Sequence, residues 1–559
     1  MEVWKQMGKY ERRLCVLLAV TSFTNPFSVL SLLFFHYTPN YHCDVTNIER
    51  SVEIMHSEKF NRSYNLSEKV SLREFLIPEE TSLLGKISQS RCFVFNRTRQ
   101  ELREFAESAE TMQTNNNTGE KIPCNFVEFH YEKDTTSAAQ EFGMVCGNAW
   151  KKPMVGVNYM IGKFVGTALS GWISDKFGRK VAFFLFTFVQ FAAACVISFS
   201  ANFEMYLALV FCMGIGSVGN YAAAIMLGSE TVGKQHRNFI CSGISVGYAF
   251  GYMFVPAIAY FLQQWRRYTL ATGLVGVIYI PFYWFIDESP RWLNAVGKTK
   301  KAEKILEKIS KYNGRKIEMQ KAEEPETKST LKMWLEFLKS PSLMFRLLLT
   351  CSSWVICNMT YYAILFDTNS LTGSRFLNCF YAGVVELLAY IVSFATVERG
   401  GRKNTYLGFM VAAGLAIIVT PFIKLWSEVA VTILTMLSKL CVTVGYYVVY
   451  ISTPELFPTA LRHTTMSVAS ACGRFGGMLA PLIIFSGQNG DSYIPYLASG
   501  ILTIIVSLLY ILLPNTHNAP LPDSVPEAVQ MENRKFCCFG KKLEIESKLA
   551  EEEIPMTEV

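Results

Sequence analysis

Long apolar stretches separated by short polar segments dominate the pattern of this chain. Runs of about 20 nearly uncharged residues recur along most of its length, and about 20 residues span the hydrocarbon core of a bilayer. The pattern predicts an all-α membrane protein of twelve transmembrane helices, with both termini on the cytoplasmic side. The expected spans are 14–36, 152–173, 181–200, 204–228, 238–262, 266–286, 344–366, 376–397, 404–424, 428–451, 464–486 and 491–513.

A hydrophilic stretch, residues 38–149, separates the first two spans. Sequons and an even number of cysteines are typical of an oxidising, extracellular compartment. We therefore expect a glycosylated extracellular loop whose cysteines are disulfide candidates; the three pairings that four cysteines allow stay open. The sequons and cysteines are Asn61, Asn65, Asn96 and Asn116, with Cys43, Cys92, Cys124 and Cys146.

A second polar stretch, residues 287–343, divides the spans six and six. Its lysines mark it as cytoplasmic, because short cytoplasmic loops carry an excess of Lys and Arg. Apolar residues at Ala302, Ile305, Leu306 and Ile309 recur at helical spacing and predict an amphipathic helix on the ends of the bundle. The expected organisation is a cytoplasmic N-terminus, an N-terminal half, this loop, a C-terminal half and a cytoplasmic tail: residues 1–13, 14–286, 287–343, 344–513 and 514–559.

Composition agrees with a membrane protein and not with a nucleic-acid binder. Hydrophobic residues make up 50% of the 559 residues and charged ones only 18%. The net charge of +7 comes from Lys and Arg in loops between spans, where they set topology. In the tail, Cys537 and Cys538 lie among basic residues and fit palmitoylation. The terminal residues 557–559 fit a ligand of a PDZ domain, which would bind Val559 and its carboxylate.

The two predicted halves repeat two polar motifs in register. The first is an acid, a glycine and two bases after the second and eighth spans: Asp175, Gly178, Arg179 and Lys180, then Glu398, Gly401, Arg402 and Lys403. The second is an acid and an arginine seven residues apart, after the fourth and tenth spans: Glu230 and Arg237, then Glu455 and Arg462. Duplicated six-helix halves build transporters, with the substrate near the midplane between them.

The chemistry of these motifs is electrostatic. A carboxylate, a tight glycine turn and two cations at helix ends can neutralise one another and the helix termini. We expect the motif residues to form a gate that holds the halves together in one conformation and releases them in the other. Positive charge placed only for topology would not require the acid or the glycine.

Several segments resemble known transporters. The segment Gly171–Lys180 resembles the signature of the major facilitator superfamily. Asp287–Leu293 and Pro454–Thr459 resemble solute carrier family 22, the organic ion transporters. Within that family the likeness is greatest to the organic cation/carnitine branch, through four segments: Asn202–Met205, Asn220–Lys234, Tyr248–Tyr252 and Pro520–Asp523.

Four ionisable side chains lie near the middle of predicted spans: Lys163, Glu386, Lys439 and Arg474. Each costs about 2.5–3.5 kcal/mol at the bilayer centre on insertion scales, so each needs a partner or a function. Glu386 can neutralise only one of the three cations. Two positive charges then remain for water, backbone or a ligand, and we expect a substrate with an anionic group.

Arg474 is the expected receptor of that group, because a guanidinium pairs with a carboxylate through two parallel hydrogen bonds. Ser470 lies one turn earlier on the same face and suits a second contact. Lys439 and Glu386 fit a structural pair equally well. A quaternary ammonium would need an aromatic cage. The candidate residues are Tyr221, Tyr248, Trp354, Tyr361 and Tyr362. Each of them could instead serve in helix packing.

The resemblance adds roles to some of these residues. Cation-selective members of the family have aspartate where Arg474 stands, whereas anion- and carnitine-type members have arginine. At Tyr390 the chain matches carnitine-type members, while anion transporters often have lysine there. Asn220 and Ser470 occupy positions that resemble substrate contacts of the family.

Two further positions bear on ion coupling and charge preference. Asn25 matches an asparagine that the resemblance ties to sodium coupling, although proline replaces the glycine that follows it in the family. The pair Asn25 and Pro26 also predicts an interruption of the first helix. Lys163 has no counterpart in the carnitine branch and favours a purer anion.

The sequence therefore predicts a secondary transporter and not an enzyme. The expected substrates are small organic zwitterions or ions of carnitine type, taken up across the plasma membrane by alternating access with sodium as the co-transported ion. The alternative is an organic anion exchanger on the same fold, and a third reading is a non-transporting sensor or scaffold. We expect no cofactor and no metal site, because no His/Cys cluster has metal spacing. Gly228–Gln235 resembles a phosphate-binding loop but lacks its final Ser or Thr and follows a predicted membrane helix.

Overall fold

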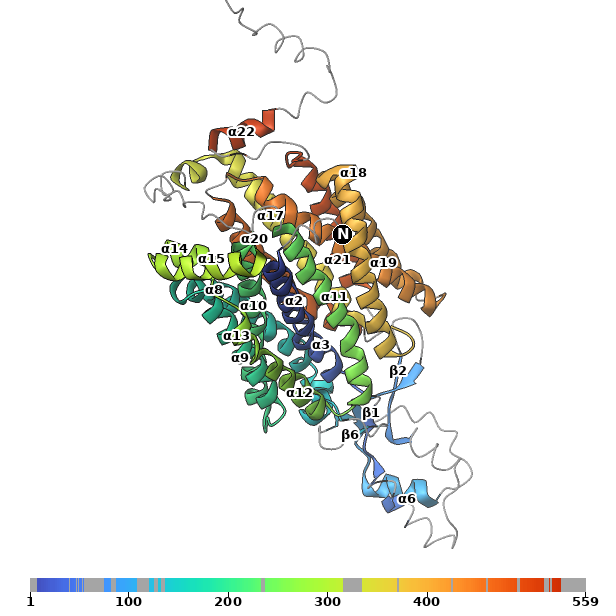
Figure 1. The fold of residues 1–559 in the computed structure, drawn as a ribbon. Helices are drawn as coiled ribbons and strands as arrows, with labels where there is room; N and C mark the ends of the chain where they lie inside the picture. The colour runs from blue at the N-terminus through green and yellow to red at the C-terminus, as the bar shows by residue number, and fades with distance from the viewer. Residues whose placement is uncertain are drawn as a thin grey trace, which may run out of the picture.

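The structure is a computed structural model of the chain (Figure 1). It describes residues 8–39, 41–46, 48, 50–52, 54, 75–81, 87–107, 120–124, 129–131, 136–232, 237–314, 334–368, 371–423, 426–458, 461–489, 493–516, 522 and 525–533. Three of the four sequons, the two tail cysteines and the C-terminal tripeptide lie outside these residues. Long helices run side by side through most of the molecule.

The N-terminal half contains six spans. The first is divided into α2 (Lys9–Thr24) and α3 (Pro26–Phe35), as the Asn25–Pro26 pair predicted, because proline has no N–H to donate to the preceding turn. The sixth is divided into α12 (Trp265–Leu274), η4 (Val275–Tyr279) and α13 (Phe282–Phe285). The other four are α8 (Lys151–Phe177), α9 (Arg179–Ile197), α10 (Phe203–Thr231) and α11 (Arg237–Phe261).

The C-terminal half repeats this arrangement. In α18 (Arg375–Ile423) two spans join at Gly401, which has a φ of 74° and breaks the helix. The other spans are α17 (Pro341–Asp367), α19 (Glu428–Glu455), α20 (Arg462–Asn489) and α21 (Ile494–Leu509), which continues into η6 (Tyr510–Leu512). Ten helices among the described residues are long and apolar enough to cross a membrane. One of them, α18, holds two spans, and the charged α8 adds another, so the twelve predicted spans are confirmed.

The polar loop lies at one end of the bundle, which we call the loop end. It contains three two-stranded antiparallel sheets that the sequence analysis did not predict. The strand pairs are β1 (Tyr41–Cys43) with β6 (Phe129–Tyr131), β2 (Glu79–Thr81) with β3 (Ile87–Gln89), and β4 (Phe93–Phe95) with β5 (Lys121–Pro123). Short helices accompany them, including α6 (Arg99–Glu107), α7 (Ala138–Glu141) and η2 (Cys146–Asn148).

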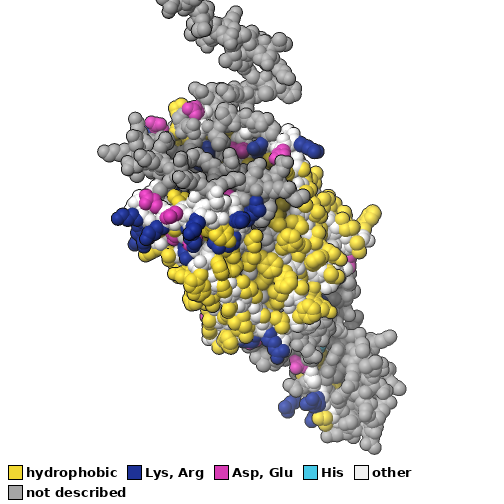
Figure 2. Space-filling model, in the orientation of Figure 1, with side chains coloured by type: hydrophobic (Ala, Val, Ile, Leu, Met, Phe, Trp, Pro, Cys, Tyr) yellow, Lys and Arg dark blue, Asp and Glu magenta, His cyan; other side chains and the backbone are white. Residues whose placement is uncertain are grey.

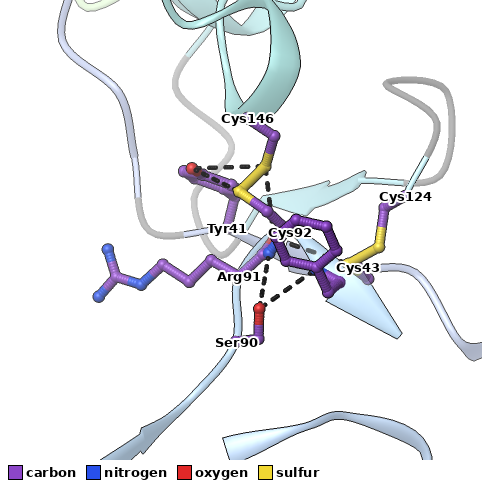
Figure 3. Close-up of a disulfide and its surroundings, with 8 residues drawn as sticks. Tyr41, Cys43, Ser90, Arg91, Cys92, Cys124 and Cys146 are labelled. Carbon is purple, nitrogen blue, oxygen red and sulfur yellow. Dashed lines mark hydrogen bonds between the residues drawn. A yellow bond between two sulfur atoms is a disulfide. The ribbon is translucent and has the colours of Figure 1, made fainter. Parts of the chain in front are cut away.

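Two disulfides fix this loop (Figure 3). One of the three possible pairings is present, Cys43 with Cys124 and Cys92 with Cys146. The Tyr41 hydroxyl lies 3.8 Å from both sulfur atoms of the second bridge. That bridge ties the strands to η2, directly before α8, so the loop is anchored to the bundle. The described sequon asparagine, Asn96, is exposed beside β4.

Short helices cover the opposite end, which we call the tail end (Figure 1). They are α14 (Pro290–Ala295), α15 (Thr299–Asn313) and α22 (Val525–Asn533). The predicted amphipathic helix is confirmed as α15, with Ala302 and Ile309 buried. Asn313 at its end accepts a hydrogen bond from the backbone N–H of Tyr10 at 2.9 Å, so α15 belongs to the N-terminal half. In the C-terminal half, Arg346 of α17 donates to the carbonyl of Ala528 in α22 at 2.6 Å.

The outer surface of the bundle is apolar (Figure 2). Hydrophobic side chains cover its middle in this view, and Lys and Arg side chains gather toward both ends. Large exposed apolar side chains belong to many of the spans, including Phe188, Ile391, Phe394 and Ile433, each more than 60% exposed. Because lipid solvates such a surface, this chain is a multi-pass membrane protein.

Candidate functional site

Two helix pairs bring the halves together, α8 with α20 and α11 with α18. Glycines bring α20 and α8 close to helices of their own halves. A Cβ at Gly476 of α20 would overlap the Val355 carbonyl of α17, and one at Gly162 of α8 would overlap the Phe211 carbonyl of α10. Small residues allow such packing between membrane helices. Lys163 follows Gly162 on α8, and Arg474 lies two residues before Gly476 on α20, so both cations belong to helices that meet at the boundary between the halves.

The α8–α20 side of the boundary carries a group that we call the cationic cluster: Lys163, Arg474, Tyr159 and Tyr362. Lys163 Nζ donates to Tyr362 Oη at 3.1 Å, from the N-terminal half to the C-terminal half. Its ammonium also lies 5.2 Å from the centre of the Tyr159 ring. Lys163 and Arg474 are close enough to repel each other. Within the described part of the chain, no carboxylate forms an ion pair with either cation.

Arg474 is the less satisfied of the two cations. Its Nε is buried and has no hydrogen-bond partner among the described residues. Tyrosines surround the guanidinium, and two of them, Tyr446 and Tyr450 of α19, are only half-buried. Arg474 as a whole is partly exposed inside the bundle, but tyrosine hydroxyls do not neutralise a guanidinium, so its charge stays unbalanced there. A ligand with an anionic group would balance that charge.

The α11–α18 side carries a second group, which we call the paired cluster. Lys439 Nζ lies 3.4 Å from a carboxylate oxygen of Glu386, and both residues are about 2% exposed. Tyr361 donates to both oxygens of that carboxylate, at 3.0 and 2.9 Å, and Tyr390 donates at 3.4 Å. Lys439 also lies 4.0 Å from the ring centre of Tyr252, which belongs to the other half. The carboxylate therefore has partners on three sides, as a structural ion pair requires.

The remaining predicted substrate contacts fall into two groups. Ser470, Tyr221 and Tyr248 are half-buried inside the bundle, where a solute between the halves could reach them. Asn220 is only 1% exposed; it donates to Gln190 at 3.3 Å, and its Oδ1 has no partner among the described residues. Trp354 is fully buried, donates to Thr453 at 2.9 Å and packs within the C-terminal half, which favours the packing role.

Asn25 lies at the interruption between α2 and α3. Its Nδ2 donates to the backbone carbonyl of Ser217 in α10 at 2.9 Å. The Ser217 hydroxyl in turn lies 3.1 Å from the Tyr159 hydroxyl. Asn25 is therefore linked to the cationic cluster through α10, although it does not touch the cations. Its role in sodium coupling stays a prediction.

The repeated motifs form equivalent ion pairs in the two halves. Arg179 pairs with Glu230 at 3.0 Å, and Arg402 pairs with Glu455 at 3.0 Å. The preceding glycines, Gly178 and Gly401, both have positive φ, at 111° and 74°. Each of these pairs joins helices of the same half, and the link between the halves that we expect in one conformation stays a prediction. Arg179 also pairs with Asp175 at 3.0 Å, whereas Glu398 is exposed. The Arg237 side chain lies outside those described.

Sequence reasoning missed some participants. Glu288 accepts hydrogen bonds from the backbone N–H groups of Arg179 and Lys180, at 2.9 and 3.1 Å, and so caps α9. Its position in the family-like segment Asp287–Leu293 was the available signal. Tyr159 was missed because it lies one turn before Lys163 among many aromatic residues, and nothing in the pattern marks it.

Comparisons with known proteins agree with this geometry. A family model described as "Sugar (and other) transporter" matches residues 116–524. A human protein named organic cation/carnitine transporter 2 is 28% identical over 95% of this chain and 93% of its own length. A fruit-fly organic cation transporter protein is 26% identical over 96% and 94%. The xylose transporter XylE from E. coli, in an inward open conformation, has a TM-score of 0.55 at 18% identity, covering 68% of this chain and 89% of its own.

Proposed function

We propose a substrate class from one premise: the chain belongs to the sugar (and other) transporter family of the major facilitator superfamily. It is not an enzyme, and its similarity to solute carrier family 22 makes it a secondary transporter of organic ions. Transporters of this architecture bind their substrate between two halves that rock against each other. The substrate we propose is a small organic ion with a carboxylate, of carnitine type. The observation that carries this proposal is the cationic cluster, in which two cations have no carboxylate partner among the residues that the structure describes.

Arg474 is the proposed receptor of the carboxylate. Its guanidinium can offer two parallel hydrogen bonds, and a buried Nε is already without a partner among the described residues. Ser470 lies one turn away on α20 and can donate a further hydrogen bond. Lys163 is committed to Tyr362 in the present conformation, so it contributes mainly through its charge.

The other end of the substrate would meet aromatic side chains. Tyr221, Tyr248 and Tyr361 are half-buried, and the faces of tyrosine rings attract a quaternary ammonium. The human relative is named for carnitine, a zwitterion with both groups, and this name favours the zwitterion. Asn220 remains a proposed substrate contact, because its Oδ1 has no hydrogen-bond partner among the described residues and could accept a hydrogen bond from a substrate hydroxyl.

An organic anion exchanger is the second candidate function. It is favoured by Lys163, which places a second cation beside Arg474. A dianion would neutralise both charges, whereas a zwitterion brings only one. The two candidates thus differ in how much negative charge the cationic cluster needs.

The proposed cycle is alternating access at the plasma membrane, with both termini cytoplasmic. The halves touch at the loop end, where Phe34 stacks on Phe376 at 5.6 Å and Arg375 lies 4.0 Å from the Tyr37 ring centre. With the loop outside, these contacts close the extracellular end in this conformation. The ion pairs Arg179–Glu230 and Arg402–Glu455 would keep each half rigid while it moves. Sodium, with Asn25 as its proposed contact, would be the co-transported ion.

The test is uptake of labelled carnitine, with and without external sodium, in cells that express this chain. A labelled aromatic dianion is measured beside it, and cells without the chain give the background. Sodium-dependent carnitine uptake is the expected result. Dianion uptake without carnitine uptake would replace the zwitterion by the anion exchanger. Absence of saturable uptake for both substrates would overturn the proposed substrate class.

A further inference from the structure

An arginine joins the two halves at the loop end through aromatic rings. The guanidinium of Arg375, at the start of α18, lies over the ring of Tyr37, 4.0 Å from its centre. Tyr37 follows α3 and belongs to the N-terminal half, so this contact crosses the boundary. The guanidinium also lies 4.9 Å from the ring centre of Phe376, its neighbour on α18. Both Arg375 and Tyr37 are half-buried.

The position of Arg375 suits a cation poorly. It is the first residue of α18, and the unpaired N–H groups at a helix N-terminus favour negative charge and not positive charge. Among the residues that the structure describes, the Arg375 side chain forms no ion pair and no hydrogen bond. Cation–π attraction is therefore what favours the charge here. Phe376 moves with Arg375 on the same helix, so only the attraction to Tyr37 depends on how the halves are arranged.

Aromatic packing beside this contact limits the access of water. Phe34 of α3 stacks on Phe376, with ring centres 5.6 Å apart and an angle of 12° between the planes. Tyr260 of α11 meets Phe376 edge-on at 5.6 Å. The cavity left between Arg375 and the ends of α11 and α12 is about 20 Å³, which is room for about one water molecule. Because a cation is attracted to a ring more strongly where water is scarce, the contact with Tyr37 is strongest when the loop end is closed.

Opening of the loop end must break this contact. Arg375 and Phe376 would move away with α18, while Tyr37 and Phe34 stay with the N-terminal half. We propose that Arg375 is a latch: its cation–π contact with Tyr37 favours the conformation that is closed at the loop end and lowers the population that is open there. This inference rests on the alternating access proposed above and not on the identity of the organic ion.

A charged residue suits a latch that must open again in every cycle. A closure made only of apolar side chains would expose all of its surface to water on opening, which is costly. The guanidinium is instead hydrated when the halves separate, so part of the lost attraction is replaced. The Arg375–Tyr37 contact therefore biases the equilibrium between the two conformations without locking it.

The experiment measures opening of the loop end without any substrate. Ala259 of α11 is 4% exposed and lines the cavity beside Arg375, so Ala259→Cys is a reporter of opening. With the loop outside, a membrane-impermeant thiol reagent reaches this cysteine only when the loop end opens. Its modification rate is measured in intact cells, and the chain without the reporter gives the background. In the reporter chain we expect Arg375→Gln to raise the rate roughly two- to thirtyfold, the range set by the usual strength of cation–π contacts.

Substitutions of Tyr37 in the same reporter chain separate the ring from its hydroxyl. Tyr37→Phe keeps the ring and should leave the rate near the native value, whereas Tyr37→Leu should raise it as much as Arg375→Gln does. The double variant should show no further rise, because both substitutions remove the same contact. Arg267→Gln is the matched control: Arg267 is an exposed arginine in the first turn of α12, and its replacement should leave the rate unchanged.

The latch would be overturned by a native rate in both Arg375→Gln and Tyr37→Leu. Effects that multiply in the double variant would overturn it too, as would an equal rise in Arg267→Gln, which would assign the effect to net charge. Surface biotinylation identifies a variant that folds poorly, and the two substitutions test the contact from opposite halves. Uptake of the labelled organic ions is a separate readout. The substrate proposal can therefore fail while the modification rates change as expected, and the reverse result would overturn the latch alone.

Discussion

The two sides of the boundary between the halves contain the same ingredients and differ by one carboxylate. Each places a lysine from one half against tyrosines, at Lys163 and at Lys439. Beside Lys439 stands Glu386, held by Tyr361 and Tyr390. Beside Lys163 stands Arg474, a second cation. Both clusters contain a buried nitrogen without a hydrogen-bond partner among the described residues, Lys439 Nζ and Arg474 Nε. Only the paired cluster has a carboxylate beside its cation, and this difference separates an ion pair from a candidate ligand site.

Replacing Arg474 by alanine should have the largest effect on transport, because it removes the proposed receptor from the cationic cluster. The substrate carboxylate would lose its bidentate partner, and losing one member of a buried charge pair costs about 2–5 kcal/mol, which is roughly 30-fold or more. Uptake of the labelled substrate should fall to background. Surface biotinylation should not fall, because removing a charge that has no ion pair does not remove a stabilising interaction. Arg474→Lys keeps the charge and should retain partial uptake; uptake at the native level in Arg474→Ala would sink the assignment.

Replacing Glu386 by glutamine should act on stability before it acts on recognition. Lys439 would remain buried without its counter-charge, at a cost of about 3–5 kcal/mol. We expect a lower unfolding midpoint in detergent. The double variant with Lys439→Met removes both charges and should recover most of the loss. If the double variant is as unstable as the single one, the pair is not the reason for the instability.

Replacing Lys163 by valine distinguishes the two candidate functions. A dianion needs both cations, so its uptake should fall roughly tenfold or more if the chain is an anion exchanger. A zwitterion needs only Arg474, and its uptake should change much less. Competition between the two labelled substrates in the same cells measures this directly. Equal losses for both would mean that Lys163 acts on the fold and not on charge selection.

The fold was predictable because membrane helices leave a strong pattern. Twelve apolar runs, the break at Asn25 and the helix through Ala302 and Ile309 all follow from local periodicity. The strands of the loop did not follow, because segments of three residues carry no measurable period and depend on disulfides for support. The disulfide pairing itself is a three-dimensional property that counting cysteines leaves open.

The site residues were predictable only where the residue type is rare in a membrane span. A charge inside an apolar run stands out, so Lys163, Glu386, Lys439 and Arg474 were found together. Which of them pair could not be read from the spans, since pairing depends on how α18 and α19 rotate about their axes. Aromatic residues were harder to assign, because they are common in spans, and the structure shows Trp354 packed within the C-terminal half. The repeated arginines were found by register, but the sequence could not show that their partners lie in the same half.

The smallest expected effect concerns the hydrogen bond that crosses the boundary. Tyr362→Phe removes the oxygen that accepts from Lys163 and keeps the ring, so one hydrogen bond of about 0.5–1.5 kcal/mol is lost. If this bond holds the present conformation, the variant should alter uptake by roughly two- to tenfold and leave the unfolding midpoint nearly unchanged. Tyr361→Phe is the matched control, because its hydroxyl serves Glu386 in the paired cluster and its loss should lower the midpoint. Matching effects of the two variants on both readouts would mean that the cationic and paired clusters form one network, and the contrast between a ligand site and a structural pair would have to be abandoned.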